Sequence, residues 1–140
     1  MLRSTIFCAL LLVASANALA GPGDNAQIHF KAIASGDPAQ IMPGYADSVT
    51  LQWLGGPLDG SYTGVEKVQE VWGKFAKANG PLELRVAKLE ESANPKGATV
   101  TANVEFKGKN TIKVRYVLVY RDGQLVNEVW QIDPNLAIPY

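Results

Sequence analysis

Residues 98–132 read ATVTANVEF, KGKN, TIKVRYVLVY, RDGQ and LVNEVWQI, and this stretch decides the fold. Its three longer runs are rich in Val, Ile, Thr and Tyr, which favour strands. The two separators each contain Gly beside Lys, Asn or Asp, as tight turns between strands require. The pattern predicts strands over 98–106, 111–120 and 125–132. A similar run over 82–89, followed by Asn94-Pro95-Lys96-Gly97, extends the prediction to an antiparallel meander.

The chain before the meander carries two helical patterns with a strand between them. Residues 26–34 have apolar side chains at helical spacing. Ser35-Gly36-Asp37-Pro38 ends that helix, because Gly adopts the left-handed conformation of a helix end and Pro suits the start of a short following helix. The period changes to two from Tyr45 to Trp53, and residues 65–79 return to helical spacing. The fold class is therefore α+β.

The strand over 111–120 is apolar on both faces, with Val117 and Val119 on one side and Val114, Tyr116 and Leu118 on the other. One layer of helices covers only one face of a sheet. The second face therefore either packs against the same face of another copy, giving a homodimer through the sheet, or remains exposed to water.

Residues 1–20 have the pattern of a secretory signal peptide. Arg3 supplies the positive charge, residues 6–14 the apolar run, and Ala18-Leu19-Ala20 the small-residue cleavage site. The apolar run is too short for a bilayer, which a helix crosses with about 20 residues. We therefore expect cleavage after Ala20, one domain over 21–140, a periplasmic or secreted location and no stable membrane anchor.

Composition excludes several classes of partner. Without Arg3, twelve of the thirteen Lys and Arg remain against thirteen Asp and Glu, and they are scattered along the chain. We therefore expect neither nucleic acid nor an anionic membrane as partner. The single cysteine, Cys8, lies in the signal peptide, and His29 is the single histidine. The usual zinc ligand sets and a thiol nucleophile are absent, so we expect no metal and no cofactor.

Four short motifs accompany the helix and strand order: Ala34-Ser35-Gly36-Asp37, Tyr45-Ala46-Asp47-Ser48, Tyr62-Thr63-Gly64 and Trp130-Gln131-Ile132-Asp133. With them the chain resembles the SnoaL-like branch of the nuclear transport factor 2-like superfamily over nearly all of its mature length. The resemblance implies a cone-shaped, curved antiparallel sheet wrapped around N-terminal helices, with an internal pocket. Ketosteroid isomerases, epoxide hydrolases, polyketide cyclases, dehydratases and binding proteins share this fold, so the fold alone does not choose an activity.

The ketosteroid isomerase pattern is not met. Aligned with that family, the sequence has His29 at the oxyanion tyrosine, Trp53 at the carboxylate base and Val117 at the protonated aspartate. Isomerase chemistry needs the carboxylate and the two acidic groups. The resemblance therefore excludes isomerisation by the usual mechanism and implies a pocket that contains an indole and a valine.

The candidate catalytic residues are His29, Arg115 and Glu128. A lone imidazole facing a cavity is suited to proton transfer near neutral pH, and its alternative is a plain residue at the pocket edge. Arg115 is costly to bury alone, so we expect Glu128 as its partner, either as a structural clamp between strands or as a binding pair for a ligand. The Asp-Arg-Asp set that the resemblance implies for an epoxide hydrolase is incomplete.

The candidate ligand-binding residues are Trp53, Tyr62, Val117 and Trp130. Indoles stack on apolar or aromatic ligands, although they can equally form plain core. Our first hypothesis is an exported, homodimeric protein that binds a small apolar or aromatic molecule. The alternatives are an acid–base enzyme of the hydrolase, dehydratase or cyclase type and a purely structural or assembly role.

Overall fold

The computed structural model describes residues 21–139, so the predicted signal peptide lies outside the described residues. The helices are Pro22–Ser35 (α1), Pro38–Ile41 (α2) and Val65–Asn79 (α3). The strands are Tyr45–Leu54 (β1), Gly60–Thr63 (β2), Glu83–Asn94 (β3), Gly97–Lys107 (β4), Thr111–Arg121 (β5) and Gln124–Ile132 (β6). Between residues 21 and 139, no helix is long and apolar enough to cross a membrane.

Helix α1 begins at Pro22, four residues before the predicted start. Proline suits this position because its φ angle is already helical and its missing N–H would have no partner in the first turn. The backbone N–H of Gly23 instead finds an acceptor far along the chain, donating to Glu91 Oε2 at 2.7 Å. The predicted end is confirmed: Gly36 has φ 75° and its N–H donates to the Ile33 carbonyl.

The six strands form one sheet in the order β2-β1-β6-β5-β4-β3. The meander of β3 to β6 is antiparallel, as predicted, but the sheet is mixed because β1 lies parallel to β6. Hairpin turns are local signals and do not reveal which strand lies on the far side of β6. Strand β2 was also not predicted, since four residues are too few to show a period.

Strand β3 extends five residues beyond its predicted end at Leu89. Its pairing with β4 shifts between Ala87 and Glu90, and Lys88 has φ 52°. This bulge interrupts the alternation on which the prediction depended. The strand continues as the exposed edge of the sheet, where polar side chains are tolerated.

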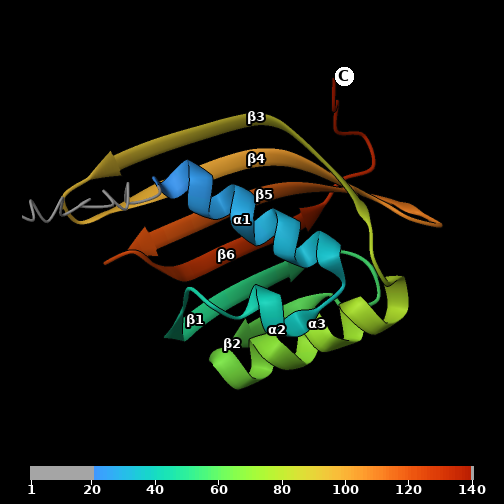
Figure 1. The fold of residues 1–140 in the computed structure, drawn as a ribbon, viewed down its shortest axis with the longest axis horizontal. Helices are drawn as coiled ribbons and strands as arrows, with labels where there is room; N and C mark the ends of the chain where they lie inside the picture. The colour runs from blue at the N-terminus through green and yellow to red at the C-terminus, as the bar shows by residue number, and fades with distance from the viewer. Residues whose placement is uncertain (1–20, 140) are drawn as a thin grey trace, which may run out of the picture.

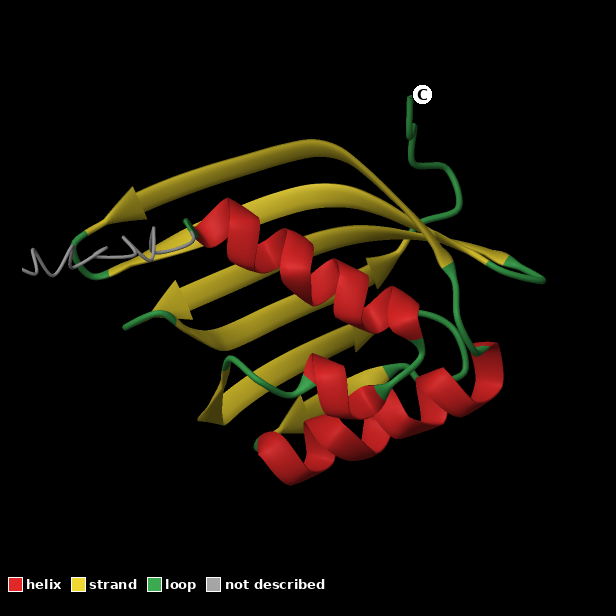
Figure 2. Cartoon of the chain, viewed as in Figure 1, coloured by secondary structure: helices red, strands yellow, loops and turns green. Residues whose placement is uncertain are grey.

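The helices lie on one face of the curved sheet (Figure 1). Helix α1 packs on β3 and β4, and α3 packs on β1 and β2. Figure 2 shows the three helices of residues 21–139 on the same side of the sheet, and none of them covers the opposite face, which is called the outer face below. The segment after β6 is tied to this sheet by Lys113 and Arg85, which donate to the carbonyls of Leu136 and Ile138 at 3.2 and 3.3 Å.

Candidate functional site

Helix α1 and strand β6 bring His29 and Glu128 into contact. His29 Nε2 lies 2.6 Å from Glu128 Oε1, although 99 residues separate them in the chain. Glu128 is 1% exposed and His29 is 7% exposed. Two of the three residues that the sequence analysis grouped as candidate catalytic residues therefore form one buried pair.

Two tyrosines complete the coordination of the carboxylate. The Tyr45 hydroxyl on β1 donates to Glu128 Oε2 at 2.6 Å, and the Tyr116 hydroxyl on β5 donates to Oε1. Tyr45 in turn accepts a hydrogen bond of 2.8 Å from Trp72 Nε1 on α3. We call these five side chains, each from a different element, the Glu128 network.

The electrostatics of this network follow from burial. Removing a carboxylate from water is costly unless hydrogen bonds replace the water, and Glu128 accepts from two tyrosine hydroxyls and contacts His29 Nε2. Burial raises the pKa of both Tyr45 and Tyr116 well above the usual value, and the negative charge of Glu128 raises each pKa further. The two phenols therefore stay protonated and remain donors to the carboxylate.

A cavity of about 180 Å³ lies beside this network, with His29 in its lining. Its lining carries no Asp, Glu, Lys or Arg. The lining residues are Asn25, Ile28, His29, Gln40, Pro43, Gly44, Tyr120, Gly123 and Leu125. We call this space the mouth cavity.

His29 connects the network to the mouth cavity. The fully buried side-chain nitrogens or oxygens without a partner, within residues 21–139, are the indole Nε1 atoms of Trp53 and Trp130. His29 Nδ1 is not among them and has no hydrogen bond in this part of the chain, so it retains contact with solvent. The same holds for the hydroxyl of Tyr120, which is mostly buried. His29 and Tyr120, which carry these two groups, both line the mouth cavity.

Comparison with solved structures identifies the fold. A protein of unknown function from Pseudomonas putida KT2440, described as nuclear transport factor 2-like, is 19% identical, with 76% of this chain and 80% of that chain covered at a TM-score of 0.65. A candidate ketosteroid isomerase from Parabacteroides distasonis ATCC 8503 is 18% identical, with coverage of 81% and 88% and a TM-score of 0.65. The chain has the nuclear transport factor 2-like fold.

A third similar structure has a different description. A candidate calcium/calmodulin-dependent protein kinase II association domain from Xanthomonas campestris is 16% identical, with coverage of 80% and 85% and a TM-score of 0.63. No family model and no curated protein matches the sequence. At these sequence identities the similarity establishes the fold alone, so any activity must be inferred from the residues of the site.

Within this nuclear transport factor 2-like fold, Arg115 does not reach Glu128. Its guanidinium lies on the outer face, where Nη1 donates to Asn103 Oδ1 at 3.3 Å. The predicted Arg115–Glu128 pair is therefore wrong. The reason is a bulge: β5 pairs Tyr120 with Leu125 but Val119 with Asn127, and this extra residue in β6 turns Glu128 to the helix side.

None of the four expected ligand-binding residues lines the mouth cavity. Val117 is on the outer face, because it alternates with the buried Tyr116 and Leu118. Tyr62 lies on β2, and its hydroxyl donates to the Leu58 carbonyl at 2.6 Å.

The tryptophans Trp53 and Trp130 fill the interior of the cone. Their ring centroids are 4.7 Å apart, and each lies 5.3 Å from the ring of Trp72. Phe75 and Phe106 extend the same cluster. These indoles form core, and the cavity that reaches His29 begins beyond them.

Sequence reasoning missed three tyrosines of the site, Tyr45, Tyr116 and Tyr120. One signal was available: a tyrosine on the buried face of a strand needs a hydrogen-bond partner for its hydroxyl. Tyr116 and Tyr120 fall on the face of β5 that also carries Leu118. Over the described range, no group of three or more His, Cys, Asp or Glu is placed to hold a metal ion.

Proposed function

We propose that the mouth cavity binds a small neutral molecule and that His29, oriented by Glu128, accepts a proton from it. The observation that carries this proposal is the contact of 2.6 Å between His29 Nε2 and a carboxylate that is 1% exposed. A carboxylate in this position fixes the imidazole orientation and stabilises the imidazolium that forms when the other nitrogen takes a proton.

The roles of the two ring nitrogens follow from their neighbours. Nε2 faces a carboxylate to which the hydroxyls of Tyr45 and Tyr116 already donate, so Nε2 carries the hydrogen and donates it to Glu128. The neutral ring then has its lone pair on Nδ1, which retains solvent contact at the mouth cavity. Tyr120 is placed to donate its hydroxyl to an oxygen on which negative charge develops.

Stability alone does not account for this arrangement. Replacing a buried ion and its partners by apolar side chains of similar volume is often neutral or stabilising. The rest of the interior is apolar and aromatic, so such a replacement would be compatible with its surroundings. A charged group in that setting, next to a cavity, is typical of a functional site.

The single histidine makes the test specific, because every imidazole signal belongs to His29. Nitrogen-15 correlation spectra are expected to show the tautomer with hydrogen on Nε2, and diethyl pyrocarbonate to modify Nδ1. As a chemical probe, deuterium uptake from D₂O into cyclohexanone is expected to be at least tenfold faster with the wild type than with His29→Gln, since a positioned base contributes about 10²–10⁴-fold on its own substrate.

The outcome that contradicts the proposal is equally clear. An Nδ1-protonated tautomer, or an imidazole that diethyl pyrocarbonate does not modify, would remove the base from the cavity. Glu128→Gln is the matched variant, since it keeps the shape and removes the charge. It is expected to lower the exchange rate and to change the tautomer populations.

Binding without chemistry is the second candidate, and Ile28 favours it. This side chain is 61% exposed at the rim of the mouth cavity, beside Pro43 and Leu125. An apolar rim suits the capture of a small apolar or aromatic molecule. Retention of such a molecule in native mass spectra, with no difference in exchange rate between wild type and His29→Gln, would favour this candidate.

We also propose export and dimerisation. Export rests on the signal-like residues 1–20 and predicts a mature amino terminus at Gly21, which sequencing of the exported protein tests. Dimerisation rests on the outer face, where Val117, Val119 and Val129 are half-buried with no helix over them. Sedimentation is expected to show a dimer for the wild type and a monomer for Val117→Glu.

A further inference from the structure

Two recesses on the helix side of the sheet meet at Tyr120. The mouth cavity has a neighbour of about 270 Å³, called the turn pocket below, between the first turns of α1 and the ends of the β3–β4 and β5–β6 hairpins. Three residues line both spaces: Asn25 on α1, Tyr120 on β5 and Gly123 in the β5–β6 turn. The two recesses therefore share a border formed by these three residues.

The strand pairing places the turn pocket on the helix side of the sheet. Tyr120 is paired with Ala98, and Ala98 with Ala93, so the three side chains form one row on one face. Tyr120 is 7% exposed and lies on the face of β5 that packs under the helices. Pro22 and Asn25 line the same pocket from α1. Both recesses therefore lie between α1 and the sheet.

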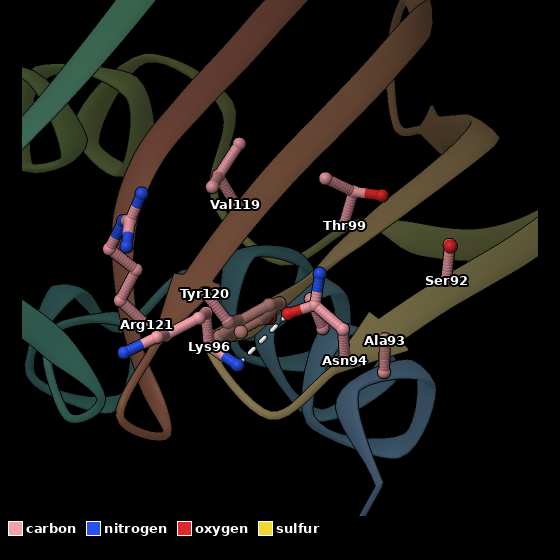
Figure 3. A pocket seen from close by; sticks show the side chains of 10 residues that line it. Ser92, Ala93, Asn94, Lys96, Thr99, Val119, Tyr120 and Arg121 are labelled. Atoms are coloured by element: carbon pink, nitrogen blue, oxygen red, sulfur yellow. Dashed lines mark hydrogen bonds between the residues drawn. The ribbon is translucent and has the colours of Figure 1, made fainter.

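A different pocket lies across the sheet and is not part of these recesses. Figure 3 shows its Ser92, Thr99 and Val119 side chains projecting from adjacent strands. These residues form the row next to Tyr120, and successive side chains of a strand point to opposite faces, so they belong to the outer face. The paired strands β4 and β5 separate them from His29. That pocket therefore belongs with the proposed dimer interface.

Tyr120 is the bulky side chain at the border that the two recesses share. Its neighbours in the row are alanines, Ala98 directly opposite and Ala93 one strand further, so the sheet presents little bulk beneath the turn pocket. Burial raises the pKa of the Tyr120 phenol above its usual value, and the negative charge of Glu128 raises it further. Because a charge acts most strongly at short range, the phenol lies towards the Glu128 network. The ring therefore stands between the mouth cavity and the space above the two alanines.

We propose that the Tyr120 ring, opposite Asn25, divides one recess into the mouth cavity and the turn pocket and thereby limits the ligand at His29 to a compact neutral carbonyl compound. This inference rests on the proposed function and names the ligand class of the same site. A carbonyl compound supplies the oxygen to which Tyr120 donates and, beside it, the acidic hydrogen that His29 removes.

The cavity volumes support the size limit. Pockets that enclose drug-sized molecules have volumes of about 300–1,000 Å³. The mouth cavity, at about 180 Å³, is smaller than these. A carbonyl compound with a bulky substituent therefore needs the turn pocket, which Tyr120 closes to it.

Two cyclic ketones that differ in bulk provide the test: cyclohexanone and 4-tert-butylcyclohexanone. The His29 imidazole signals of the mature protein report binding of each, and the ratio of the two dissociation constants is the readout. We expect the wild type to bind cyclohexanone about tenfold more tightly or better, because the larger ketone does not fit beside the Tyr120 ring. In Tyr120→Leu the substituent gains the turn pocket, whose charged residues, Lys96 and Asp122, are exposed. We expect the ratio to shift about tenfold in favour of the larger ketone, the effect of a methylene group or two in an apolar pocket.

Two further variants separate bulk from hydrogen bonding. Tyr120→Phe keeps the ring and removes the hydroxyl, so both ketones are expected to weaken by the same factor and the ratio to stay within twofold. Ala98→Leu fills the turn pocket from the position directly opposite Tyr120. Alone, it is expected to change neither affinity more than twofold, whereas Tyr120→Leu/Ala98→Leu is expected to restore the wild-type ratio.

The contrary outcomes are distinct from failure of the proposed function. An unchanged ratio in Tyr120→Leu would overturn the inference, and so would a wild type that binds both ketones equally. If Tyr120→Leu does not fold, Ala98→Leu decides: weaker binding of the larger ketone alone would mean that the ligand already reaches the turn pocket, and unchanged binding supports the division. The proposed function fails separately, through the tautomer and modification experiments on His29, which do not depend on ligand size.

Discussion

Glu128→Leu provides the sharpest test of what the Glu128 network does for the folded protein. The substitution removes the acceptor that His29 Nε2 and the hydroxyls of Tyr45 and Tyr116 share, and leaves the hydroxyls only the longer contacts of 3.3 and 3.2 Å to Nε2. Each buried donor without a partner costs about 1–3 kcal/mol, and the loss of the desolvated carboxylate offsets part of the sum. We expect the free energy of unfolding to fall by about 4 kcal/mol, within the 3–5 kcal/mol typical of a broken buried pair.

The companion variant is His29→Leu/Tyr116→Phe/Glu128→Leu. It removes two of the stranded donors together with the carboxylate and places apolar groups in an apolar interior. One donor, the Tyr45 hydroxyl, still lacks an acceptor, although it keeps its bond from Trp72. We therefore expect this triple variant to recover most of the loss and to unfold within about 1–2 kcal/mol of the wild type.

Urea denaturation followed by tryptophan fluorescence measures both variants. With a slope of about 2 kcal/mol per molar, a loss of about 4 kcal/mol lowers the midpoint by roughly 2 M. Glu105→Leu is the control, since Glu105 is also buried but accepts only from Arg85, at 3.1 Å, and Arg85 is partly exposed. About 1 kcal/mol is expected there. A triple variant no more stable than Glu128→Leu would mean that the network exists for stability, and the functional argument would fail.

Two further predictions concern pH and backbone conformation. The pKa values of Tyr45 and Tyr116 are raised in the folded state, so the stability that these tyrosines contribute is complete below about pH 10 and is lost as the pH rises above it. In Tyr116→Phe, the free energy of unfolding is therefore expected to fall less steeply above pH 10, by about 1.4 kcal/mol per pH unit. Urea denaturation at several pH values measures this difference. Gly36→Ala is expected to destabilise by about 2 kcal/mol or more, because φ is +75° and the new Cβ would lie 2.9 Å from the Gly80 carbonyl carbon. Gly73→Ala, inside α3 with open space around it, is expected to stabilise by about 0.5–1 kcal/mol, and equal thermal shifts for the two glycine variants would contradict this account.

Local patterns in the sequence were sufficient for most of the fold. Strand alternation, helical spacing and the Gly-containing turns located α1, α3, β1 and the four strands of the meander. They could not show that β1 lies parallel to β6, because that pairing joins Trp53 to Trp130 across 77 positions of sequence. Pairings of this kind depend on which apolar faces meet in the folded chain, and no turn signal records them.

The site was predictable only in part, for the same reason. His29, as the lone imidazole, and Glu128, as an ionisable residue in an apolar strand, were grouped with Arg115 as candidate catalytic residues, but Glu128 was paired with Arg115. Their contact depends on the crossing of α1 over the sheet, which neither residue reveals. The mouth cavity, too, is formed by residues from α1, α2, β5, β6 and the intervening turns, so no single motif marks it.

The bulge in β6 explains why the pairing with Arg115 was predicted wrongly and why the site exists at all. Continued without a bulge from Tyr120 and Leu125, the register would place Glu128 opposite Val117, on the outer face with Arg115. The extra residue places Glu128 opposite Leu118 instead, and every later side chain of β6, including Trp130, changes face with it. One unpaired residue in a strand therefore moves a carboxylate from the outer face into the core. There it contacts an imidazole and two phenols beside a cavity.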